Sequence, residues 1–166
     1  MAKSGGKNQA KAKTDDEPIK IVARNRRARF EFDLIEKVEA GIVLCGTEVK
    51  SLRNGRSSLE EAYAGVENGE VWLYGCDIPE YLQANRMNHK PKRPRKLLLH
   101  RREIDKLISK ASEKGFTLIP LQIYFKKGIA KVEVSIAKGR KMYDKREAVK
   151  KQDARRDMDR VLRGRG

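Results

Sequence analysis

The stretch LQIYFKKGIAKVEVSIAKG, residues 121–139, decides the fold class of this chain. In its second half, apolar residues occupy every other position from Ala130 to Ile136, and polar residues stand between them. Such alternation is typical of a β-strand with one buried face, and Lys127-Gly128 supplies a turn between two runs of this kind. The stretch therefore predicts an antiparallel hairpin.

Two upstream segments extend the β pattern. YAGVENGEVWLYG, residues 63–75, has Asn68-Gly69 between strand-like runs, a strong hairpin signal. FEFDLIEKVEAGIVL, residues 30–44, alternates from Phe30, and its Gly41 indicates a bulge or a barrel corner. Because strands do not alternate with helices, we expect a mainly β fold, an antiparallel OB-type barrel of five to seven strands, closed or nearly closed.

One short and one longer helix are expected beside the barrel. TEVKSLRNG, residues 47–55, predicts a short helix that Asn54-Gly55 ends. KLLLHRREIDKLISKASEKG, residues 96–115, places Leu97, Ile104, Leu107, Ile108 and Ala111 on one face of a helix that ends at Gly115 and covers a barrel mouth. Between them QANRMNHKPKRPRK, residues 83–96, with two prolines and no acid, predicts a loop that cannot join the sheet.

The two ends of the chain differ from this body. Residues 1–18 have no apolar periodicity and are expected to be a disordered leader before a barrel domain at 19–137. Residues 138–166 hold twelve basic and five acidic side chains, with acids ahead of bases at helical spacing, as in Asp153 with Arg156. We expect this tail to be disordered in the free protein and helical when bound.

Charge and composition limit the function classes. The net charge of +16 predicts attraction to polyanions, and no apolar run or signal core indicates a membrane, so a cytoplasmic protein without a membrane partner is expected. Cys45, Cys76, His89 and His100 lack ligand or redox spacing. We therefore expect buried thiols, no metal, no cofactor, no catalytic residue and no enzymatic activity.

The arginine-rich clusters favour RNA as the polyanion. Arginine binds phosphate bidentately, and the small number of aromatic residues argues against a platform that stacks many single-stranded bases. Folded RNA, recognised by shape and phosphate, fits this composition best. No large apolar interface is indicated, so a monomer is expected.

Five motifs resemble one known family. The chain resembles the SmpB family, from about Ile19 to Arg146, in the motifs ARNRRAR (23–29), EAGIVLCGTEVKSLRNG (39–55), NGEVWLYG (68–75), RKLLLHRREIDKL (95–107) and KGRKMYDKRE (138–147). The resemblance implies a barrel that binds the tRNA-like domain of transfer-messenger RNA (tmRNA), and a tail that enters the small-subunit decoding site and empty mRNA channel of a stalled ribosome. It implies ribosome rescue by trans-translation, with elongation factor Tu an indirect partner through the charged RNA.

The same resemblance assigns candidate residues. RNA-binding positions are Asn25, Arg26, Arg27, Arg29, Glu39, Glu48, Lys50, Arg53, Arg93, Arg95 and Lys96. For Glu39 and for the three positions from Glu48 to Arg53, chemistry alone leaves RNA contact and structural support equally open. Ribosome-binding tail positions are Lys138, Gly139 as a hinge, Lys141, Tyr143 as a stacking ring, Asp144, Lys145 and Arg146.

Two departures and two alternatives accompany this reading. Phe30 and Ala154 stand where many members have His and Trp, so no tail contact beyond Arg146 is carried over. A structural ribosomal protein with a tail threaded into ribosomal RNA, and an unspecific RNA-binding OB module, are the alternatives.

Overall fold

The structure, a computed structural model, describes residues 19–84 and 88–163, so the expected disordered leader lies outside the described residues. The strands are β1 (Lys20–Arg24), β2 (Phe32–Ile42), β3 (Tyr63–Glu67), β4 (Glu70–Tyr74), β5 (Arg95–Leu98), β6 (Phe116–Lys126) and β7 (Ile129–Gly139). The helices are α1 (Ala28–Glu31), α2 (Gly46–Arg53), α3 (Arg101–Ala111) and α4 (Met142–Arg163).

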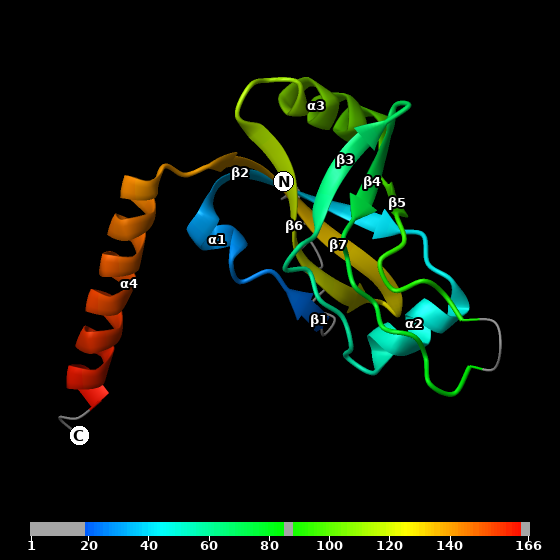
Figure 1. The fold of residues 1–166 in the computed structure, drawn as a ribbon, viewed down its shortest axis with the longest axis horizontal. Coiled ribbons are helices and arrows are strands. Elements are labelled where there is room, and N and C mark those ends of the chain that lie inside the picture. Colours follow the sequence, from blue (N-terminus) through cyan, green and yellow to red (C-terminus); the bar gives the residue numbers. More distant parts are fainter. Residues whose placement is uncertain (1–18, 85–87, 164–166) are drawn as a thin grey trace, which may run out of the picture.

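The strands form a closed antiparallel barrel. Their order is β1-β6-β3-β4-β5-β2-β7, and pairing of β6 with β7 closes a ring of six strands that β1 extends at β6. The expected mainly β, OB-type barrel is thereby confirmed. Helices α3 and α2 lie near opposite ends of the barrel, and α4 extends away from it beside α1 (Figure 1).

The predicted hairpins form at the predicted turns. Residues 68–69 connect β3 to β4 and residues 127–128 connect β6 to β7, and all four have positive φ, from 52° to 74°. Asn and Gly tolerate this left-handed region best, which is why Asn68-Gly69 was the clearer signal. The inward side chains from Ala130 to Ile136 are buried with the rest of the core.

The strand after the basic loop was missed. Residues 95–98 form β5, which pairs with β4 and β2, so the expectation that 83–96 stays outside the sheet is wrong at its last two residues. Arg95 made this segment look polar, but its charge is neutralised inside the protein by Glu48. The loop itself is anchored by His89, which lies 2.9 Å from both Thr47 Oγ1 and the Ile78 carbonyl oxygen.

The boundaries of the longer helix were also misplaced. Helix α3 begins at Arg101, because the Glu103 carboxylate accepts a hydrogen bond from the His100 amide at 2.9 Å, and it ends at Ala111. Gly115, with φ of +89°, lies in the turn into β6 and does not end the helix. The capping role is confirmed, since Leu107 is fully buried and contacts the core beneath it.

The tail forms a helix in the structure. Met142–Arg163 is α4, and the expected disorder of the free tail stays a prediction. Two of the predicted acid–base pairs are present, Asp153 with Arg156 at 3.9 Å and Asp157 with Arg160 at 3.6 Å, and they support this helix. Its dependence on the ribosome stays a prediction.

Candidate nucleic-acid interface

A short basic arm joins β1 to β2. Its fold depends on Asn25, whose side-chain oxygen accepts a hydrogen bond from the Ala28 amide at 3.0 Å and whose side-chain nitrogen donates to the Leu59 carbonyl at 3.2 Å. The Asn25 amide also donates to the Leu121 carbonyl, at the bulge of β6. These bonds start α1 at Ala28, which explains why Phe30 belongs to a helical turn and not to the expected strand.

The arm presents its arginines to solvent. Arg26, Arg27 and Arg29 are exposed, whereas Asn25 is buried and its side chain holds the turn through two hydrogen bonds. The structure therefore brings these three arginines together as candidate phosphate ligands. It gives Asn25 a positioning role, and direct RNA contact by Asn25 stays a prediction.

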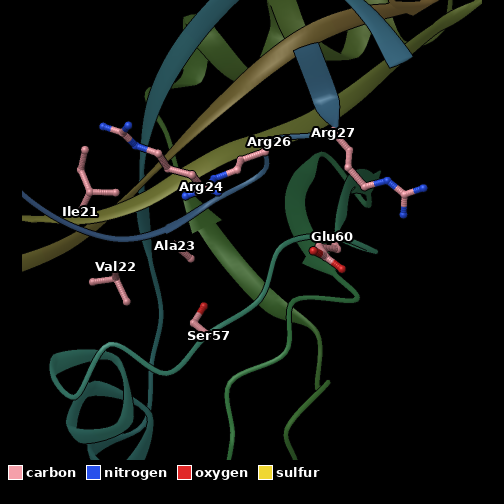
Figure 2. Close-up of a pocket in the computed structure, with 8 residues that line it drawn as sticks. All are labelled: Ile21, Val22, Ala23, Arg24, Arg26, Arg27, Ser57 and Glu60. Carbon is pink, nitrogen blue, oxygen red and sulfur yellow. The ribbon is translucent and has the colours of Figure 1, made fainter. Parts of the chain in front are cut away.

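Two hollows flank the arm. The first, of about 430 Å³, lies between the arm and the loop after α2, and Figure 2 shows Arg24, Arg26 and Arg27 on one side with Ser57 and Glu60 on the other. The second, of about 560 Å³, is lined by Arg24, Arg29 and Lys37, and Arg156 of α4 reaches it. Arg24 lines both hollows and was missed as a candidate, although it lies in the same basic run as Arg26.

Glu48 and Arg95 are buried, a placement that favours structural support over RNA contact. Both side chains have no exposed area, and Arg95 Nε donates to Glu48 at 2.9 Å. Arg95 Nη1 donates to the carbonyls of Cys76 and Arg93, and Nη2 donates to the carbonyl of Pro91, at 2.6 to 3.1 Å. A guanidinium bonded in this way ties α2 to β5.

Arg93 completes this cluster at the surface. Its Nε and Nη2 donate to the two Glu48 oxygens at 2.7 and 2.6 Å, and its side chain is 29% exposed. Burial opposes ionisation of Glu48, but the Arg93 and Cys45 amide hydrogen bonds and the Arg95 charge outweigh it and lower the Glu48 pKa below 4.5. The Glu48 hydrogen bond likewise raises the Arg93 pKa.

Glu39 lies on the outer face of β2 within a charged network. Its carboxylate accepts a hydrogen bond from the Tyr124 hydroxyl and lies 3.6 Å from Lys126 and 3.5 Å from Lys131. The Tyr124 hydrogen bond is the main cause of its lowered pKa, with the two lysines contributing. The contacts with Tyr124 and the two lysines give Glu39 a structural role. Its side chain is still 38% exposed, so part of the carboxylate surface is open to a ligand.

The other body candidates are scattered. Lys50 and Arg53 are exposed on α2, with the Lys50 ammonium 5.5 Å from the centre of the Tyr81 ring. Lys96 is on β5, where it pairs with Glu70 of β4. These candidates lie on α2 and β5, elements that do not carry the arm.

The first two tail candidates belong to the last strand of the barrel. Lys138 and Gly139 are the last residues of β7, paired with Asp33 and Phe32 of β2. Arg140 continues this attachment through its Nε to Asp33 at 2.6 Å, a contact that the sequence did not suggest. Lys141 and Arg146 are exposed, whereas the side chains of residues 143–145 lie outside what the structure describes.

The expected buried thiols are confirmed at one position only. Cys76 is fully buried, and burial raises its thiol pKa to about 11. Cys45 is exposed at the start of α2, with its sulfur 3.5 Å from Arg93.

In residues 19–84 and 88–163 no cluster of three metal-ligating side chains occurs. The helices described over the same ranges include none with the length and apolarity of a membrane span.

Comparisons with known proteins agree on one family. The family model described as SmpB protein matches residues 22–164. An SsrA-binding protein of Bradyrhizobium diazoefficiens is 56% identical over 156 residues, covering 93% of this chain and 99% of the relative. An SsrA-binding protein of Nitrobacter winogradskyi is 58% identical over 149 residues, covering 89% of this chain and 95% of the relative.

A solved structure has the same fold. It is described as "tmRNA-SmpB: a journey to the center of the bacterial ribosome", and its matching chain is 45% identical with a TM-score of 0.62. The match covers 76% of this chain and 92% of that chain.

Proposed function

Because the chain belongs to the SmpB family, we propose that it binds the tRNA-like domain of tmRNA and brings that RNA into stalled ribosomes for trans-translation. The observation that carries this proposal is the arm, where Asn25 fixes a turn that exposes Arg26, Arg27 and Arg29. Three preorganised arginines suit the phosphates of a folded RNA. The protein contributes binding and shape, without a catalytic step of its own.

RNA capture is assigned to the body. The arm arginines, with Arg24 at the two hollows, would contact the phosphate backbone, and Glu39 would accept hydrogen bonds from base or ribose donors. Arg93, Lys50, Arg53 and Lys96 are secondary contacts on the exposed surface. Glu48 and Arg95 hold the segment that carries Arg93.

Ribosome contact is assigned to the tail. Helix α4 leaves the barrel after Lys141 and carries exposed basic side chains, so it can follow the empty mRNA channel while residues 138–146 occupy the decoding site. Gly139 would serve as the hinge, and Tyr143 as the ring that stacks on a base. We further propose that the protein acts as a cytoplasmic monomer and meets elongation factor Tu only through the charged RNA.

Competition binding tests the RNA assignment. Full-length protein is mixed with the labelled tRNA-like fragment of tmRNA, and unrelated structured RNA of equal length competes at physiological salt. A preference of about a hundredfold, or about 2.7 kcal/mol, is expected. Equal binding would leave an unspecific RNA-binding module. Stoichiometric co-sedimentation with ribosomes that lack tmRNA would instead indicate a structural ribosomal protein.

A double variant tests the proposed contacts. Arg27→Ala combined with Glu39→Ala should weaken binding of the fragment while the circular dichroism spectrum stays unchanged, because both carboxylate and guanidinium lie on the surface. The matched control is Arg101→Ala with Asp105→Ala on α3, an exposed pair away from the arm. Loss of the folded circular dichroism spectrum in the Arg27→Ala, Glu39→Ala variant would indicate that both residues support the fold and would contradict their role in RNA contact.

A further inference from the structure

Tyr124 of β6 holds the carboxylate of Glu39 on the outside of the barrel. Its hydroxyl donates a hydrogen bond to Glu39 Oε2 across β7, the strand that lies between β6 and β2. Tyr124 itself is only 5% exposed, and its partners on the neighbouring strands are Ile21 of β1 and Lys131 of β7. A buried ring with two side-chain torsions has little freedom, so its hydroxyl fixes one oxygen of Glu39 in place.

The carboxylate of Glu39 keeps capacity for further hydrogen bonds. Lys126 Nζ lies 3.6 Å from Oε2, and Lys131 Nζ lies 3.5 Å from Oε1. Both distances exceed the roughly 2.9 Å of an ordinary N–H···O hydrogen bond. Because a carboxylate has about four lone-pair sites, the partly exposed Glu39 can still accept from amino or ribose hydroxyl groups of an RNA.

The two lysines explain how an acid can belong to a surface for RNA. An isolated carboxylate repels phosphate groups, but Lys126 and Lys131 place two positive charges beside the one negative charge of Glu39. Glu133 lies directly opposite Glu39 in the register of β7 with β2, and it is neutralised separately by Lys37 at 3.0 Å. Each of the two neighbouring acids therefore has its own cationic partners.

We propose that Tyr124 is a positioning residue for RNA capture, whose hydroxyl holds the Glu39 carboxylate in the orientation that accepts hydrogen bonds from RNA. This inference rests on the proposed function, in which Glu39 contacts the tRNA-like domain. Without the hydroxyl, RNA binding would have to order a carboxylate that is free to turn between Lys126 and Lys131, which lowers affinity. The same hydrogen bond is the main cause of the lowered Glu39 pKa, so it also favours the ionised acceptor.

A double-mutant cycle in the full-length protein tests this role. Binding of the labelled tRNA-like fragment is measured by fluorescence anisotropy at about 0.15 M salt. Tyr124→Phe, which keeps the ring, should weaken binding about fivefold, and Glu39→Gln should weaken it about tenfold. The double variant should also bind about tenfold more weakly than the unaltered protein, because Tyr124 acts only through Glu39.

A second tyrosine provides the matched control. The Tyr74 hydroxyl is hydrogen-bonded to Glu67 on the β3–β4 hairpin, so Tyr74→Phe makes the same chemical change at another carboxylate. This variant should bind the fragment within about twofold of the unaltered protein. All variants should keep the circular dichroism spectrum of the unaltered protein, since each substitution preserves the size of the side chain.

The pH profile gives a readout that a purely structural role would not change. The pKa of Glu39 lies below 4.5 while Tyr124 donates to it, and loss of this hydrogen bond raises that pKa. On acidification from about pH 7, the affinity of Tyr124→Phe should therefore begin to fall at a higher pH than that of the unaltered protein. The surrounding charged groups are retained in both proteins: Lys37, Lys126, Lys131 and Glu133. The difference between the profiles should disappear when Glu39 is replaced by Gln in both.

The outcomes separate this inference from the proposed function. Effects of Tyr124→Phe and Glu39→Gln that multiply in the double variant, or unchanged binding by Tyr124→Phe, would overturn the positioning role. Unchanged binding by Glu39→Gln would also overturn it, while RNA capture by the arm arginines would stand. Equal affinity of the unaltered protein for unrelated structured RNA would instead overturn the proposed function and, with it, this inference.

Discussion

The Glu48 carboxylate and the Arg95 guanidinium meet at 2.9 Å with neither side chain exposed to solvent. One partner lies on α2 and the other on β5, 47 residues apart in the chain. Arg93 closes the cluster from the surface with a bidentate contact. The contact therefore fixes the basic loop to the barrel, and this burial favours structural support over RNA contact for both residues.

Removing Glu48 should destabilise the protein strongly. Glu48→Leu leaves Arg95 buried without its counter-charge, and the free energy of unfolding should fall by about 3 to 5 kcal/mol in urea denaturation. The double variant Glu48→Leu with Arg95→Met should recover part of this loss, since no unpaired charge remains inside. Asp105→Asn, at an exposed α3 pair, should change the value by less than about 1 kcal/mol. A Glu48→Leu protein as stable as the unaltered one would contradict this role.

Stability should depend on Glu48 in acid. Its folded pKa lies below the ordinary 4.5, so its contribution is fully present above that value and is lost as the pH falls through the folded pKa. The free energy of unfolding should therefore decrease from about pH 5 downward, and less steeply in Glu48→Gln. Some slope should remain in this variant, because Glu39 also has a lowered pKa. If the free energy of unfolding fell equally steeply with pH in Glu48→Gln and in the unaltered protein, Glu48 would be excluded as a source of the acid sensitivity.

Asn25 and Arg26 should give different phenotypes. Asn25→Ala removes two hydrogen bonds that hold the arm, so stability should fall by about 1 to 2 kcal/mol and affinity for the tRNA-like fragment should fall with it. Arg26→Ala should reduce affinity at unchanged stability, since its side chain is exposed. Denaturation and competition binding distinguish the two. Normal stability with weak RNA binding in Asn25→Ala would instead indicate direct contact.

Truncation should separate the body from the tail. The sequence predicts the boundary after Ala137, and a cut after Lys141 also preserves the pairing of β7 with β2 through Gly139 and the hydrogen bond from the Arg140 amide to the Glu31 carbonyl at 3.0 Å. A chain ending at Lys141 should bind the tRNA-like fragment within about twofold of full length and lose rescue activity in a translation assay. A chain ending at Ala137 should also lose stability. Loss of RNA affinity on truncation at Lys141 would show that α4 takes part in capture.

Local patterns predicted the elements that depend on neighbouring residues. The alternation in 129–139, the Asn68-Gly69 turn and the stop at Asn54-Gly55 are local, and each is found where expected. The start of α3 was predicted too early, because the apolar run extends back to Leu97. The Glu103 carboxylate accepts a hydrogen bond from the His100 amide and caps the helix at that point. Strand β5 was missed because its partners come from β2 and β4.

The sequence by itself determined the barrel class, the basic character, the arginine arm and the family, because periodicity, charge and motif order are properties of the chain. Only the tertiary structure decided which charged residues face a ligand. Burial depends on segments far apart in sequence, so Arg26 and Arg95 have the same chemistry but different environments: the first is exposed on a turn held by Asn25, and the second is neutralised by Glu48 in the interior.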